Sequence, residues 1–161
     1  MMNIESQMKL HGALSIYKVT GKRNQYKELV FNEENLITLA AKQSILLFIY
    51  QAAITSDPIN KLWVGTGGSL DPQGLFPRIE DPTQTNLNVP LLNVVTTFTT
   101  DLTIPSVTFI ADLDTGTGNG SLISEAGLFR TSNLIFNIKN FPAVPKTSDF
   151  GLHFNWVIKF A

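Results

Sequence analysis

The sequence predicts a mainly β protein, and more specifically a β-sandwich of the jelly-roll type with one α-helix near residues 36–52. Two observations carry this prediction. Residues 151–160 alternate between apolar and polar side chains, and a period of two is typical of a strand with one buried face. After Pro58, turn signals rich in Gly, Asn and Pro separate further short apolar runs, a spacing typical of sandwiches and jelly rolls.

The predicted elements follow in order along a single domain, residues 10–161, behind an N-terminal arm of residues 1–9. Residues 10–19 and 26–31 are two strands that form a hairpin. Asn35 is a suitable N-cap for the helix, whose apolar side chains follow a 3.6-residue period. The remaining predicted strands are residues 59–64, 89–99, 107–111, 122–129, 134–139 and 152–160.

Composition argues against several classes of protein. The chain has no cysteine, so it has no disulfide or cysteine-based zinc site, and two histidines offer little for a histidine metal site. The net charge of −1 argues against general nucleic-acid binding, which uses a basic surface. The longest apolar run, residues 45–50, is too short to span a bilayer, and Glu5 lies where an export signal would be apolar. We therefore expect no metal, no cofactor, no nucleic acid and no membrane, and synthesis in the cytoplasm.

The low charge of the chain bears on its surface. Charged residues make up 16% of the sequence, below the ~25% typical of soluble domains, and the 16 Thr and 13 Asn together outnumber them. A surface poor in charge suits a protein that partners largely cover, because interface cores are depleted of charge. The alternative is a sandwich with Thr-rich strands, since Thr is favoured in strands.

Three motifs suggest chemistry, and each has a simpler structural interpretation. Residues 65–69 are Gly-rich but lack the Lys and the following helix of a phosphate loop, which favours a bend between strands. Residues 112–120 could ring a calcium ion, but the Glu of an EF-hand loop is missing, and a Gly-rich hairpin loop is the alternative. Ser124 and His153 could join an Asp in a hydrolytic triad, but the nucleophile elbow is absent. We expect no catalytic residues and no enzymatic activity.

Glu125 is an acid inside an otherwise apolar strand. Such a side chain is costly to bury unless it is paired. Arg130 or Lys146 could pair with it, or backbone N–H groups at a bulge near Gly127 could donate to it. This structural role predicts that Glu125→Gln is tolerated better than Glu125→Leu.

The order of four motifs, together with the final alternating strand, is similar to that of a known group of proteins. The motifs are residues 35–38 (NLIT), 62–68 (LWVGTGG), 123–129 (ISEAGLF) and 141–147 (FPAVPKT). The chain resembles, over about residues 10–161, a group of small β-rich virion structural proteins of tailed bacteriophages. Members of this group are head decoration (cement), tail or baseplate proteins. The Pro-rich segment 71–82 departs from the shorter segment expected in this group.

The resemblance implies a role in the virion, with assembly in the host cytoplasm. It implies a capsid decoration or cement protein that binds the assembled head shell through the major capsid protein or other virion proteins, as a homotrimer. A tail, neck or baseplate component is the alternative. A carbohydrate-binding module is a second alternative, in which Trp63 and Tyr50 would stack on sugars.

Loops and arms are where binding residues concentrate, so we expect partner contacts in such segments. Trp156 and Phe154 are assigned to the core instead. The predicted contact segments are residues 2–9, 72–82 and 116–120, and the residues singled out in them are Met2, Asn3, Ile4, Met8, Pro72, Phe76, Pro77, Gly116 and Gly118.

Overall fold

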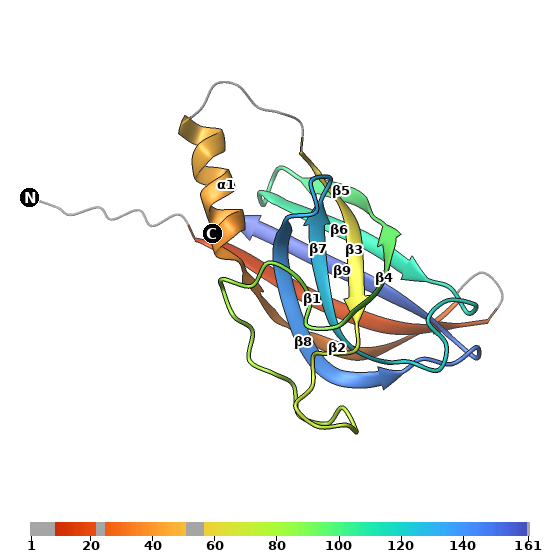
Figure 1. Ribbon diagram of the computed structural model, residues 1–161. Coiled ribbons are helices and arrows are strands. Elements are labelled where there is room, and N and C mark those ends of the chain that lie inside the picture. Colours follow the sequence, from red (N-terminus) through yellow and green to blue (C-terminus); the bar gives the residue numbers. More distant parts are fainter. Residues whose placement is uncertain (1–8, 22–24, 51–56, 161) are drawn as a thin grey trace, which may run out of the picture.

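The computed structural model describes residues 9–21, 25–50 and 57–160 (Figure 1). These residues form nine strands and one helix, and the expectation of a mainly β protein is confirmed. The elements are β1 (Leu10–Thr20), β2 (Tyr26–Ile37), α1 (Leu39–Tyr50), β3 (Ile59–Gly65), β4 (Pro90–Val95), β5 (Thr97–Asp101), β6 (Ser106–Leu113), β7 (Leu122–Arg130), β8 (Ile135–Pro145) and β9 (Gly151–Phe160). None of the described helical residues forms a segment long and apolar enough to cross a membrane.

All the described strands belong to one antiparallel sheet in the order β4-β3-β7-β8-β2-β1-β9-β6-β5. The two end strands, β4 and β5, follow each other in the chain with only Thr96 between them. The sheet therefore curls into a nearly closed barrel, and a jelly-roll sandwich is not confirmed. The single run predicted at residues 89–99 is divided at Thr96, where the chain leaves its pairing with β3 and begins to pair with β6.

Strand β2 is longer than predicted, and its additional residues join the two halves of the sheet. It pairs with β1 along most of its length, and at its end Leu36 and Ile37 pair with Ile138 and Asn137 of β8. The expected end of this strand at Phe31 is wrong. Ile37 is buried, so pairing with a distant strand outweighs the local helical pattern.

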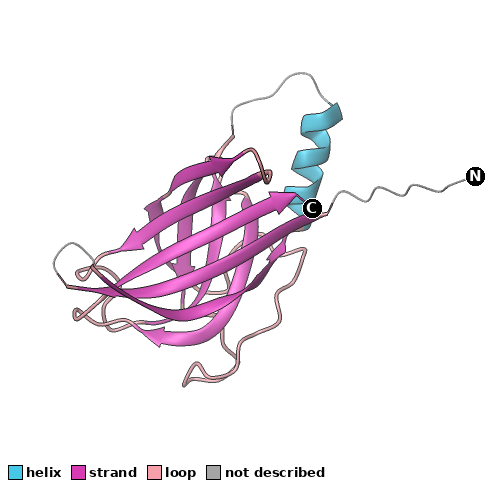
Figure 2. Ribbon diagram, turned by 180° about the vertical axis from the view of Figure 1, so that it is seen from behind, coloured by secondary structure: helices cyan, strands magenta, loops and turns pink. Residues whose placement is uncertain are grey.

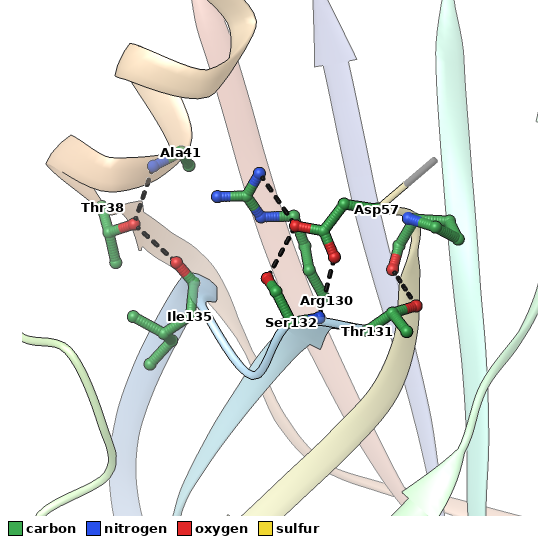
Figure 3. A network of polar contacts seen from close by, with 8 residues as sticks. Thr38, Ala41, Asp57, Arg130, Thr131, Ser132 and Ile135 are labelled. Atoms are coloured by element: carbon green, nitrogen blue, oxygen red, sulfur yellow. Dashed lines mark hydrogen bonds and ion pairs between the residues drawn. The ribbon is translucent and has the colours of Figure 1, made fainter. Parts of the chain in front are cut away.

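The helix begins three residues later than expected, and its cap is Thr38 rather than Asn35. The Ala41 backbone N–H donates to Thr38 Oγ1 at 3.2 Å, the contact expected of an N-cap, as Figure 3 shows. The same hydroxyl lies 3.1 Å from the Ile135 carbonyl oxygen and ties the helix to β8. Asn35 lies inside β2, next to Gly12. The predicted helix end at residue 52 lies outside the described residues.

Strand β8 runs to Pro145, beyond its predicted end at Lys139. The pairing of β7 with β8 shifts register between Ile123 and Glu125, so residues 141–143 form a bulge. A bulge is one of the places where a sheet tolerates proline, here the exposed Pro142. Pro142 and Pro145 are the reason that the sequence predicted a turn in this segment.

The main core lies between the two halves of the curved sheet. Strand β9 is central to it, between β1 and β6, and its residues Leu152, Phe154, Trp156 and Ile158 are buried. The assignment of Phe154 and Trp156 to the core is confirmed, and the alternation that predicted β9 has the burial pattern expected of it.

A second, smaller cluster lies on the outer face of β7 and β8. It contains Leu87, Phe129, Ile135 and Ile138, with Leu36 and Trp63 packed against it. Leu87 comes from the loop between β3 and β4, which crosses this face in Figure 1. The opposite face, seen in Figure 2, carries β1 and β9 with no helix or loop across it. The interior of the barrel and the loop-covered face of β7 and β8 together hold most of the buried apolar side chains.

Candidate interaction site

The loop of residues 66–89 is anchored at both ends by Glu125, which is fully buried in β7. One carboxylate oxygen accepts hydrogen bonds from the backbone N–H groups of Gly67 (3.1 Å) and Val89 (2.7 Å). The other accepts from the backbone (2.8 Å) and the side chain (2.9 Å) of Asn88. Four donors satisfy a carboxylate that would otherwise be costly to bury. Glu125 therefore fixes both ends of the loop against β7.

The expectation of a paired Glu125 is confirmed, but its donors are none of the three that we considered. Arg130 and Lys146 are not among the four donors to Glu125 described above. Arg130 lies 3.5 Å from Asp57 (Figure 3), and Lys146 Nζ donates to Asn119 and Thr147. Three of the four donors are backbone N–H groups, and all four come from the loop rather than from a bulge near Gly127.

The Gly-rich run at the start of the loop allows this close approach. A Cβ at Gly68 would overlap the carbonyl oxygen of Ser124, and a Cβ at Gly65 would overlap the carbonyl oxygen of Val89. The Gly68 N–H donates to Ser124 Oγ at 3.0 Å. The run leads out of β3 into a further loop and not into a helix, as expected of a Gly-rich bend between strands. Its glycines also allow the chain to pack closely against β7.

Beyond the glycines the chain makes a closed turn at residues 69–77. Ser69 and Pro77 form an isolated β-bridge, and the Leu70 N–H donates to the Phe76 carbonyl at 2.8 Å. Asp71 accepts from the backbone N–H groups of Leu75 (3.0 Å) and Phe76 (2.7 Å). These bonds, the one from Leu75 first, lower the pKa of Asp71 to about 2. The turn is thus held from inside by one carboxylate.

The returning half of the loop is fastened to β8 and to the helix. Arg78 Nε donates to the carbonyl oxygens of Gly67 (2.9 Å) and Ser69 (3.0 Å). Glu80 accepts from the backbone N–H of Asn140 at 2.8 Å. The Leu39 N–H, at the start of α1, donates to the Pro82 carbonyl at 2.8 Å. The loop is long but is fixed to the body at several points along its length.

The fixed turn and the chain just after it expose large apolar side chains. Ile79 is 94% exposed, and Leu70, Leu75 and Phe76 are between 64% and 67% exposed. We call these four residues the apolar tip. In Figure 1 the turn projects beyond the end of the sheet. Exposed apolar groups gathered on an ordered protrusion are typical of interaction sites.

The structure brings three of the predicted contact residues together in this turn. Pro72, Phe76 and Pro77 are all exposed there. Leu75 and Ile79 lie inside the predicted contact segment 72–82 but were not singled out, and Leu70 lies outside that segment. The available signal was a set of large apolar residues in a loop without helical or strand periodicity. The predicted contacts in the arm, at Met2, Asn3, Ile4 and Met8, lie outside the described residues.

The other predicted contacts, Gly116 and Gly118, lie in the separate loop between β6 and β7. Asp114 accepts there from the Gly116 N–H (2.9 Å) and from the Thr117 hydroxyl (2.6 Å). These bonds, the hydroxyl first, lower the pKa of Asp114. Buried Lys146 reaches this loop, and its burial lowers the pKa of its ammonium group while Asp114 opposes the shift. The side-chain oxygens of Asp114 and Asn119, which a calcium site in this loop would use, thus already accept hydrogen bonds within the protein.

The fold does not bring together the residues considered for a calcium site, nor those considered for a hydrolytic triad. Asp112 lies 2.7 Å from His153 Nδ1, away from the internal bonds of Asp114. Ser124 is buried on β7, and the order of the sheet places β8, β2 and β1 between it and His153 on β9. Among the described residues, no three His, Asp or Glu side chains are grouped so that they could hold a metal ion.

The position of Trp63 bears on the carbohydrate alternative. Its ring lies 6.3 Å from that of Phe129, in the cluster beneath the loop. The Trp63 side chain is therefore partly buried by this cluster. The side chain of Tyr50 lies outside the described residues.

Acid is expected to open the turn at residues 69–77 only well below pH 4. The folded pKa of Asp71 is about 2, below its ordinary value of 3.8, so its stabilising bonds are complete above that ordinary value and are lost as the pH falls through about 2. Amide NMR shifts of Leu75 and Phe76 should follow this titration. Asp71→Asn should abolish the acid transition at both amides. A midpoint near 3.8 would contradict the role of these bonds.

Comparison of the chain with models of protein families, with curated proteins and with solved structures gave no match.

Proposed function

We propose that this chain is a structural protein of a tailed-bacteriophage particle, a decoration or cement protein that binds the assembled head shell. The observation that carries the proposal is the apolar tip, a set of exposed apolar side chains on a loop whose backbone is fixed. An aromatic ring and aliphatic neighbours are typical anchors of protein interfaces. A loop that is ordered before binding loses little conformational entropy on binding.

The polar side chains considered for catalysis make structural hydrogen bonds, and this supports a binding role. Glu125, Ser124 and Asp71 accept hydrogen bonds that hold the loop in place. Asp112 and His153 pair with each other on β6 and β9. We propose that this protein acts by contact and not by catalysis, with the major capsid protein or another virion protein as its partner.

We further propose that copies occupy repeated sites on the shell, as trimers at local three-fold positions. Each apolar tip contributes a modest contact, and many copies reinforce a shell through the sum of such contacts. The resemblance to phage virion proteins and the low charge of the chain support this arrangement. A tail, neck or baseplate position is the competing assignment.

The proposal predicts that Phe76→Ser weakens binding to particles at least tenfold. An aromatic interface anchor contributes about 2 kcal/mol or more, and about 1.4 kcal/mol corresponds to a factor of ten. Purified protein is added to particles that lack it, and bound protein is quantified after sedimentation. The matched control is Leu134→Ser, which removes another exposed apolar side chain, in the turn between β7 and β8.

Both variants should unfold at the temperature of the unsubstituted protein, since both side chains are exposed. If Phe76→Ser bound particles as tightly as the unsubstituted protein, the apolar tip would not be part of the interface. The number of copies per particle decides between head and tail, because a shell holds copies in the hundreds whereas a ring holds only the number set by its symmetry.

A further inference from the structure

Strand β5 is an edge strand whose second edge is open. It pairs with β6 on one side, and no described strand pairs with its other side. All five of its residues, Thr97–Asp101, are exposed. An open edge leaves backbone N–H and C=O groups that a further extended strand can bind. This edge is distinct from the apolar tip, which belongs to the loop between β3 and β4.

The usual protections of an open edge are missing from β5. Natural edge strands are blunted by lysines, prolines or bulges, whereas β5 reads Thr-Phe-Thr-Thr-Asp, with one charge at its end and regular pairing to β6. Exposed apolar side chains lie on it and beside it. These are Val95 (78% exposed), Phe98 (64%), Leu102 (88%) and Ile104 (62%).

We propose that β5 pairs with β5 of a second copy of this chain, antiparallel and centred on Thr99. This register uses all five residues of both strands. Thr99 then faces Thr99 of the second copy, Phe98 faces Thr100, and Asp101 faces Thr97. No like charges meet, and the two Phe98 side chains are diagonal neighbours on one face, within reach of each other. Phe98 already lies against Phe109, with ring centroids 6.3 Å apart, so the pairing extends an apolar surface that continues into the core.

This contact is two-fold and does not depend on the proposed virion role. It joins copies in pairs, whereas a three-fold assembly needs a different, head-to-tail contact. If copies also form trimers, β5 pairing joins two trimers into a hexamer. In either case, loss of the β5 contact halves the mass of the assembly.

The test is the mass of the full chain in solution, measured by light scattering during size-exclusion chromatography. The unsubstituted protein should run as a dimer, at twice the monomer mass of 17.8 kDa, or as a hexamer. Thr99→Lys and Thr99→Glu should each halve that mass, because either substitution places two like charges opposite each other at the centre of the pairing. Mixing the two variants should restore the full mass, because the new lysine of one copy then faces the new glutamate of the other.

Thr115→Lys is the matched control, an exposed threonine changed to lysine in the loop between β6 and β7, and it should keep the full mass. Circular dichroism should show all three variants folded. The proposal is overturned if the unsubstituted protein is a monomer or a trimer, if the single variants keep the full mass, or if the mixture does not restore it. Particle binding through Phe76 is measured separately, so either proposal can fail alone.

Discussion

Glu125→Leu is expected to lower the free energy of unfolding by about 4 kcal/mol or more. Leucine removes the acceptor of four part-buried hydrogen bonds, which Gly67, Asn88 and Val89 donate, and a hydrogen bond to a charged group contributes about 1.5–3 kcal/mol. Domains have about 5–15 kcal/mol of stability in total, so this one substitution removes a large share of it. Urea unfolding followed by circular dichroism measures the change.

Glu125→Gln is expected to cost about half as much, because its side-chain oxygen keeps two of the four hydrogen bonds. Its NH₂ group then faces two donors of Asn88, the backbone N–H and the side-chain amide. The side-chain amide can rotate to present its oxygen to the NH₂ group, but the backbone N–H cannot. The matched control is Glu28→Leu on β2, where the glutamate is exposed and a change within about 0.5 kcal/mol is expected. Equal losses for Gln and Leu at position 125 would show that the loop donors do not depend on this carboxylate.

The case of Glu125 shows what local sequence can and cannot predict. An acid within an apolar strand predicts a buried, satisfied carboxylate. The donors lie 36 to 58 positions away along the chain, and every residue except proline carries a backbone N–H, so no residue type marks them. The charged side chains of Arg130 and Lys146 were considered as partners because their charge is evident from the sequence. Arg130 instead pairs with Asp57, and Lys146 donates to Asn119.

The elements show the same division between local and distant causes. Strand β9 is predictable because its own alternation matches its burial. The boundary between β2 and α1 is not predictable from the local sequence, because Asn35 and Thr38 are both suitable N-caps. The choice depends on Ile37 pairing with Asn137, a hundred residues later in the chain. The apolar tip was only partly predictable, since a leucine in a loop reads equally well as a buried anchor and as an exposed contact.

Gly68→Ala is expected to lower the free energy of unfolding by about 3 kcal/mol, as large as other severe overpacking effects. The backbone at Gly68 does not adopt a positive φ, so the cost comes from space alone. The new methyl group would overlap the carbonyl oxygen of Ser124, which cannot move without disturbing the strand pairing of β7. Thermal and urea unfolding measure the change.

Gly116→Ala is the matched control for this substitution. The nearest atom to its new methyl group would be a carboxylate oxygen of Asp114 at 3.4 Å, an ordinary contact, and its φ is also unremarkable. Alanine there restricts the unfolded chain, so the stability should stay the same or rise by about 0.4–1 kcal/mol. A Gly68→Ala variant as stable as Gly116→Ala would mean that the loop does not lie against β7 as closely as described.

Gly68→Ala also tests whether the clamp on the loop matters for binding. The run of residues 65–68 and Glu125 fix the base of the loop, and the apolar tip follows directly from that base. If order before binding contributes to affinity, folded Gly68→Ala protein should bind particles more weakly, although Leu75, Phe76 and Ile79 are unchanged. Particle sedimentation at a temperature well below its unfolding transition measures this. Full binding by the folded variant would show that the tip contacts its partner without support from β7.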